Sequence, residues 1–73
     1  MINATIRFKN GTVIDVKNLT AIDVYNSRKS GTLSGELIET VNLNPQSSYA
    51  FIGESESVSV SGIDVLCVHF SKS

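Results

Sequence analysis

The feature that most constrains the fold is an unbroken alternation of apolar and polar side chains over residues 2–9. Successive side chains of a strand point to opposite faces, so this period of two is typical of a half-buried strand. Asn10-Gly11 follows at once, and this dipeptide is the strongest short hairpin signal. The sequence therefore predicts that the chain begins with a β-hairpin. The apolar set is Ile2, Ala4, Ile6 and Phe8, and the polar set is Asn3, Thr5, Arg7 and Lys9.

The length of the hairpin loop decides which residues face each other. A two-residue loop would place Ile14 opposite Arg7, whereas a three-residue loop over residues 9–11 pairs Ile6 with Ile14. A slip of one residue would move the whole apolar set to solvent. We therefore expect the three-residue loop, with Gly11 in the left-handed conformation of a G1 bulge.

Composition and a short internal repeat also favour strands. Val, Ile and Thr supply 20 of the 73 residues and Ala supplies three, and β-branched side chains pack better on a pleated sheet than in a helix. The pattern of residues 12–18 returns over residues 20–26 with five identities in seven. A period this short does not suit a solenoid repeat. We expect two consecutive strands with the same in-and-out pattern.

The middle of the chain is less regular. Residues 27–35 are polar and predict a loop. Residues 36–43 place apolar side chains at both helical and strand spacing, and because several of them are poor helix formers we expect a strand. The alternative is one short helix at about 34–42, packed on the sheet. The remaining predicted strands cover 49–52, 57–61 and 66–70, with a tight turn at 62–64.

Together these segments predict one all-β domain over residues 1–73. Five or six short antiparallel strands would close into a small barrel or a compact sandwich. The turn Gly62-Ile63-Asp64 loosely resembles the turn before the last strand of SH3-like and Sm-like barrels. The overall character of the chain is similar to small accessory proteins of phages and mobile elements.

Several classes of protein are disfavoured by composition. Cys67 is alone, so no intrachain disulfide forms, and one Cys with one His makes a four-ligand zinc site unexpected. No apolar run has the ~18 residues of a membrane span, and the first residues lack the apolar core of a signal peptide. The net charge of −1 gives no basic footprint for nucleic acid. We expect a cytoplasmic protein with no metal and no cofactor.

One segment offers a candidate site for an anion or a nucleic acid. Arg28 and Lys29 are cations, and the hydroxyls of Ser30 and Thr32 lie beside a flexible glycine, so this loop could cradle a phosphate. Tyr25 is the aromatic ring nearest to these cations and could stack on a base. The spacing does not match a Walker loop. The ordinary alternative is a solvated hairpin loop.

Two other groups of residues could have a functional role, but we prefer an ordinary structural explanation for both. Cys67 and His69 are two apart on a predicted strand and share a face, which is the start of a nucleophile and base pair. A free Cys is more often a small hydrophobic side chain. Serines at alternate positions from 55 to 61 form a hydroxyl stripe, and such a stripe is usually the wet side of a strand.

The chain carries no triad, paired carboxylates or metal motif, so we expect no enzyme and no catalytic residues. The leading hypothesis is a protein-binding or assembly module, for example a small accessory or inhibitor-type protein. Its partners would be another protein and itself, as a dimer, because residues 30–71 contain one Pro and no Lys or Arg to protect sheet edges. The alternatives are a small-barrel nucleic-acid binder and a binder of a small anionic ligand at residues 28–32.

Overall fold

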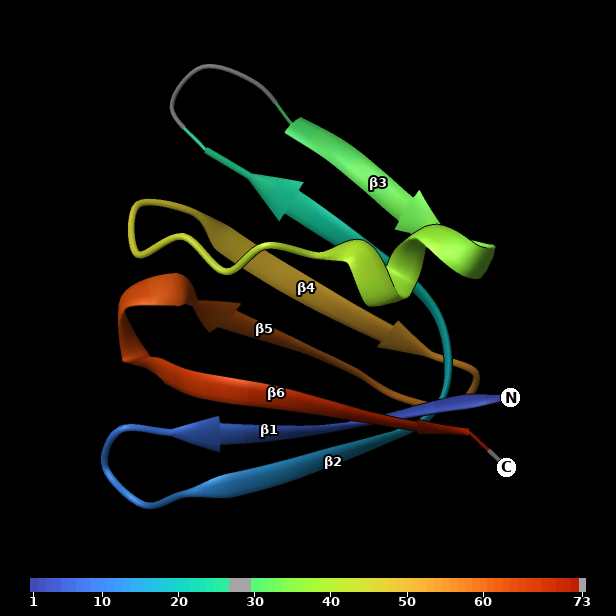
Figure 1. Cartoon of the computed structure of the whole chain (residues 1–73), viewed down its shortest axis with the longest axis horizontal. Helices are drawn as coiled ribbons and strands as arrows, with labels where there is room; N and C mark the ends of the chain where they lie inside the picture. Colours follow the sequence, from blue (N-terminus) through green and yellow to red (C-terminus); the bar gives the residue numbers. More distant parts are fainter. Residues whose placement is uncertain (27–29, 73) are drawn as a thin grey trace.

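The computed structural model describes residues 1–26 and 30–72, and these form one curved antiparallel sheet around a single core (Figure 1). The all-β prediction is confirmed. The order along the sheet is β5-β4-β2-β1-β6, and β3 pairs with β2 beside this path. The strands are β1 (Ile2–Phe8), β2 (Val13–Tyr25), β3 (Ser30–Ser34), β4 (Ser48–Gly53), β5 (Ser57–Ser61) and β6 (Val65–Lys72), and the 3₁₀ helices are η1 (Gly35–Thr40) and η2 (Gly62–Asp64).

The hairpin between β1 and β2 has the predicted register. Ile6 lies opposite Ile14, and Phe8 and Thr12 close a three-residue loop over residues 9–11. The Phe8 N–H donates to the Thr12 carbonyl oxygen at 2.8 Å, and the Gly11 N–H donates to the Phe8 carbonyl oxygen at 3.0 Å. Gly11 has a φ of +94°, so the expected left-handed glycine is confirmed. The apolar pattern of β1 and β2 was sufficient to select this loop.

The prediction of two strands over residues 12–26 is wrong, because both halves belong to the 13-residue strand β2. The strand bends at Asn18, which has a φ of +54°. The Asn18 N–H donates to the Asn3 Oδ1 at 3.0 Å, and its carbonyl oxygen accepts the Glu54 N–H at 3.0 Å. These bonds hold the bend, so the first half of β2 pairs with β1 and the second half pairs with β3 and β4.

Two predictions for residues 27–43 need correction. Part of the expected loop is the strand β3, which adds to the second half of β2. The expected strand over 36–43 is wrong, and the alternative of a short helix at 34–42 is closer, since η1 occupies Gly35–Thr40 as a 3₁₀ helix. Gly35 has a φ of +59° and turns the chain out of β3. Ile38 then becomes buried against the sheet, which favours the helix over a strand.

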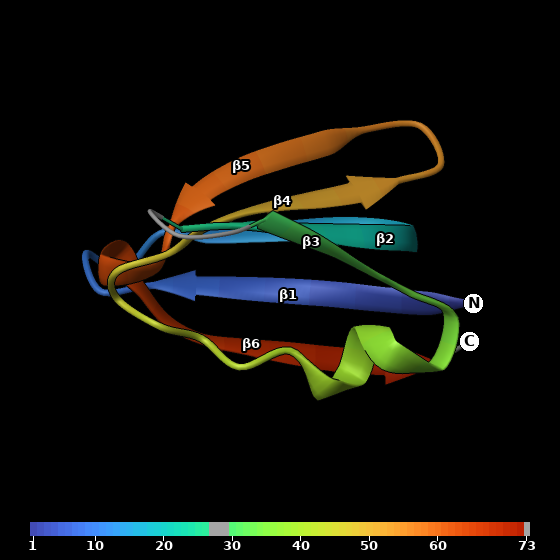
Figure 2. The ribbon, with the colours of Figure 1, turned by 90° about the horizontal axis from the view of Figure 1, so that it is seen from above.

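The core lies on the concave face of the sheet. Figure 2 shows β5 and β4 on one side of the molecule and β6 on the other, and η1 lies on the same side as β6 in this view. In the described residues no ladder joins β5 to β6, although η2 connects them along the chain. None of the helices in this part of the chain is long and apolar enough to cross a membrane. The buried apolar residues are Ala4, Ile6, Val16, Leu19, Ile22, Ile38, Tyr49, Phe51, Val60 and Val65.

Candidate functional site

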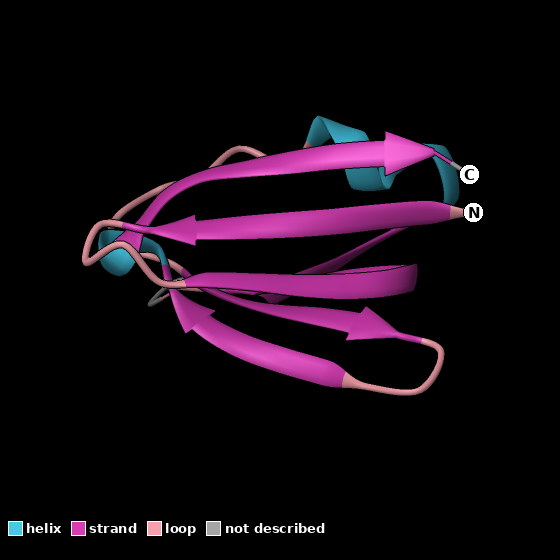
Figure 3. Ribbon diagram, turned by 90° about the horizontal axis from the view of Figure 1, so that it is seen from below, coloured by secondary structure: helices cyan, strands magenta, loops and turns pink. Residues whose placement is uncertain are grey.

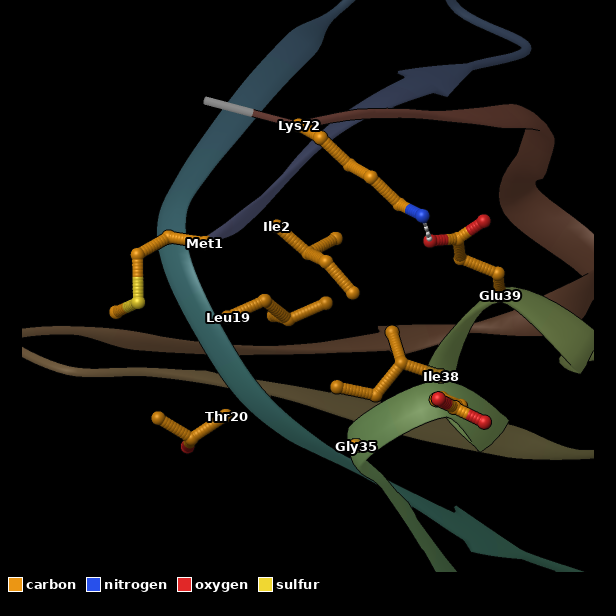
Figure 4. Close-up of a pocket in the computed structure, with 9 residues that line it drawn as sticks. Met1, Ile2, Leu19, Thr20, Gly35, Ile38, Glu39 and Lys72 are labelled. Carbon is orange, nitrogen blue, oxygen red and sulfur yellow. Dashed lines mark ion pairs between the residues drawn. The ribbon is translucent and has the colours of Figure 1, made fainter.

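A pocket of about 550 Å³ opens where the start of β1, the bend of β2 and η1 meet (Figure 4). Ile2 from β1, Leu19 from β2 and Ile38 from η1 point toward one another in its floor. Leu19 and Ile38 belong to the buried core, and Ile2 is partly buried against it. The floor of this η1 pocket is therefore an apolar surface that core residues supply.

The rim of the η1 pocket is polar and charged. The Lys72 Nζ lies 3.2 Å from the Glu39 Oε1, which ties the end of β6 to η1 (Figure 4). Both side chains are exposed, at 73% and 40%, so we expect this ion pair to contribute at most ~1 kcal/mol. Glu36 also lines the rim and has no ion-pair partner in the part of the chain that the structure describes. Its carboxylate remains available to a bound molecule.

No residue of the η1 pocket was singled out by the sequence. Ile2, Leu19 and Ile38 are apolar residues that the sequence marks as core. No local sequence pattern indicates that these three side chains meet in a pocket. The nearest signal was the helical spacing around residues 34–42, which places Ile38 between Glu36 and Glu39. Without the turn at Gly35 that spacing does not reveal a pocket.

The structure brings together three of the five residues predicted for the anion or nucleic-acid site. Tyr25, Ser30 and Thr32 lie on paired strands, with Tyr25 opposite Ser30. Ser30 and Thr32 also line a second pocket of about 250 Å³ between β2 and β3. Arg28 and Lys29 lie outside the described residues.

A carboxylate that the sequence reasoning missed lies in the middle of this group. The Thr32 Oγ1 donates to the Asp23 Oδ1 at 2.8 Å, and the Tyr25 hydroxyl donates to the Asp23 Oδ2 at 3.1 Å. The hydrogen bond from the Tyr25 hydroxyl to Asp23, together with the negative charge of Asp23, raises the pKa of Tyr25 above its ordinary value. Both hydroxyls are thus committed to a carboxylate, and an anion here would meet a like charge. Thr32 lies opposite Asp23 because β3 pairs with β2, whereas the sequence predicts a loop over these residues.

Cys67 and His69 are exposed on the outer face of β6, as expected for residues that share a face. They lie opposite Arg7 and Thr5 of β1, respectively. The alternate serines of β5 are likewise exposed on the outer face of the sheet. Across residues 1–26 and 30–72 there is no group of three or more His, Cys, Asp or Glu that could hold a metal ion.

Among the described residues, an open pocket with an apolar floor and a charged rim thus lies at η1, and a smaller pocket lies between β2 and β3 near the carboxylate of Asp23. The outer faces of β5 and β6 carry small or polar side chains for the most part. Comparison with known proteins found no family model, no curated protein and no solved structure that matches this chain.

Proposed function

We propose that the protein is a non-enzymatic protein-binding module that receives an apolar side chain of a partner protein in the η1 pocket. The observation that carries this proposal is the combination of an apolar floor with a polar rim. Protein interfaces have this same anatomy, with an apolar anchor buried at the centre and polar contacts around it. A volume of about 550 Å³ has room for a leucine- or phenylalanine-sized anchor.

The rim indicates what should flank that anchor. Glu39 is already paired with Lys72, so Glu36 is the rim carboxylate left for a cation of the partner. An exposed pair of this kind adds little affinity, but it favours one orientation and speeds association. The partner segment would therefore carry a large apolar residue next to Lys or Arg.

A selection from random peptides displayed on phage tests this proposal. We expect enriched peptides to share an apolar residue beside a basic one, and their synthetic versions to shift the amide resonances of Ile2, Leu19 and Ile38. Glu36→Lys should weaken binding about fivefold or more. Asp64→Lys, an exposed charge change at the far end of the molecule in η2, is the matched control and should have no effect.

Two outcomes would overturn the proposal. Either the selection yields no peptide, or the selected peptides shift resonances away from the η1 pocket and bind equally to the Glu36→Lys variant. Shifts at Tyr25, Ser30 and Thr32 would instead favour the alternative site. Binding of nucleic acid there should weaken steeply as salt rises, because released counterions drive it. We rank this alternative below the η1 pocket because the carboxylate of Asp23 would repel a nucleic-acid phosphate at this site.

A further inference from the structure

In the described residues three strands pair on one side only, β3 with β2, β5 with β4 and β6 with β1, and the edges of β5 and β6 differ in how they are protected. Figure 3 shows β5 as the outermost strand at one end, and in the described residues it pairs with β4 and with no other strand. At the other end, the Lys72–Glu39 ion pair links the end of β6 to η1. A register irregularity beside Leu66 also distorts β6 where it pairs with β1. Such features discourage pairing with a further strand.

β5 lacks these protective features. Its residues Ser57–Ser61 include no charged side chain and no Pro, and its ladder with β4 runs from Ser57 to Ser61 with no register shift. The backbone edge that faces away from β4 is therefore a regular row of hydrogen-bonding groups. A regular, uncharged edge of this kind is a template for another strand.

The sequence of β5 is also a palindrome, Ser-Val-Ser-Val-Ser, centred on Ser59. If a second copy of β5 pairs antiparallel about this centre, Ser59 faces Ser59 of the other copy, and Val58 faces Val60. The two serine faces then coincide, as do the two valine faces, because side chains alternate along each strand. Val60 is buried and Val58 is partly buried, so the paired valines extend the apolar face of the core. No like charges meet in this register.

We propose that the β5 edge binds a second copy of this chain, with the two β5 strands antiparallel about a twofold axis at Ser59. The two sheets become one continuous sheet. Each copy has one β5 strand in its described residues. Pairing occupies the free edge of β5 in both copies, so it forms a closed dimer and not a fibre. The interface is short, and the dimer should dissociate on dilution.

This inference goes beyond the η1 pocket and does not depend on it. β5 and η1 lie on opposite sides of the molecule in Figure 2, so dimerisation leaves both η1 pockets open. A dimer would present two pockets to a partner, and a partner with two suitable segments would bind more tightly through effective concentration. The monomer would still bind a single segment.

Disulfide trapping tests the register in a Cys67→Ser background, which removes the native thiol. We expect Ser59→Cys to give a covalent dimer on mild oxidation, since directly opposed Cβ atoms in an antiparallel pair are ~4.5–5.5 Å apart, close to disulfide geometry. Ser57→Cys alone should not cross-link, because its two copies would be four residues, or about 13 Å, out of register. A mixture of Ser57→Cys and Ser61→Cys proteins should cross-link to each other.

Mass measured by light scattering from ~5 to 200 μM tests the dimer without cysteines, a range that reveals micromolar association. Ser59→Lys should shift the protein to monomer, because two like charges would face each other at the axis. Ser71→Lys, the same change on exposed β6, should leave the dimer unaffected. An unchanged circular dichroism spectrum and cooperative urea unfolding would show that the Ser59→Lys monomer is folded.

The inference is overturned by a mass near 7.9 kDa across the whole concentration range. It is also overturned if the Ser59→Cys protein gives no covalent dimer, or if the Ser57→Cys protein cross-links as efficiently. Cross-linking through native Cys67, with loss of the dimer in Ser71→Lys, would place the interface at β6 instead. Because peptide binding is measured separately, none of these outcomes decides whether the η1 pocket binds a protein.

Discussion

The phenol oxygen of Tyr49 lies 2.7 Å from the carbonyl oxygen of Asn42 and donates its hydrogen to it. The same oxygen accepts the backbone N–H of Asn44 at 2.6 Å. The Tyr49 side chain is 1% exposed and extends from β4, whereas residues 41–47 form neither helix nor strand. One buried side chain thus holds the segment that runs from η1 to β4.

Tyr49→Phe keeps the buried ring and removes both hydrogen bonds. We expect the free energy of unfolding to fall by about 1–2 kcal/mol, because a partly buried carbonyl and N–H lose their partner. Urea denaturation followed by circular dichroism measures this change. Tyr25→Phe removes the hydroxyl of an exposed ring and is the control. If both substitutions cost the same, Tyr49 does not have the role described above.

Gly62→Ala should be among the most damaging small substitutions in this chain. A Cβ at this position would overlap the carbonyl oxygen of Asn44 and lie 2.8 Å from that of Ser47. The Gly62 N–H also donates to the Ser47 carbonyl oxygen at 2.8 Å, so the backbones cannot separate freely. We expect a loss of more than ~2 kcal/mol in thermal or urea unfolding.

The control for Gly62 is Gly31→Ala. A Cβ at Gly31 would meet nothing within 4 Å, and its φ lies outside the left-handed region. This substitution should leave stability unchanged or raise it slightly, since alanine restricts the unfolded chain. An equal cost at both glycines would contradict the close approach at Gly62.

Gly11→Val tests backbone strain separately from crowding. Gly11 has a φ of +94°, and a Cβ there would have open space around it. A β-branched residue adopts positive φ with difficulty, so we expect a loss of more than ~1 kcal/mol. Gly11→Asn should cost less, because asparagine tolerates the left-handed region. If the two variants unfold at the same urea concentration, strain at Gly11 is not what limits the loop.

The pKa of Tyr25 should fall toward its ordinary value in Asp23→Asn. In the native protein the hydrogen bond to Asp23 and the negative charge of that carboxylate favour the protonated phenol. The pKa is higher in the folded state, so the resulting stability is present below about pH 10 and is lost as the pH rises through the folded pKa. A proton NMR titration of the Tyr25 ring measures the change, and Asp15→Asn is the control. An unchanged pKa in Asp23→Asn would mean that Asp23 does not control the phenol.

The sequence by itself determined those parts of the fold in which neighbouring residues carry the information. The alternation over residues 2–9 and the turn at residues 9–11 are local features. Matching the apolar faces of β1 and β2 then allows a single register between these two strands. The alternation in β5 has the same origin. A period of two is strong enough to define a strand because a slip of one residue would expose every apolar side chain.

Only the tertiary structure decided what β2, β3 and η1 become. The repeated pattern over residues 12–26 is compatible with one strand or with two. The hydrogen bonds of Asn18 with Asn3 and Glu54 hold these residues as one bent strand, β2. β3 forms because the bend exposes a second edge of β2 to residues 30–34.

The candidate site depends on the same kind of distant contact. The η1 pocket joins Ile2, Leu19 and Ile38, and the Asp23 cluster joins β2 to β3. Apolar patterning marks such residues as buried, but it carries no information about which distant segments meet. That choice depends on contacts far apart in the chain, which form when the whole sheet curves around its core.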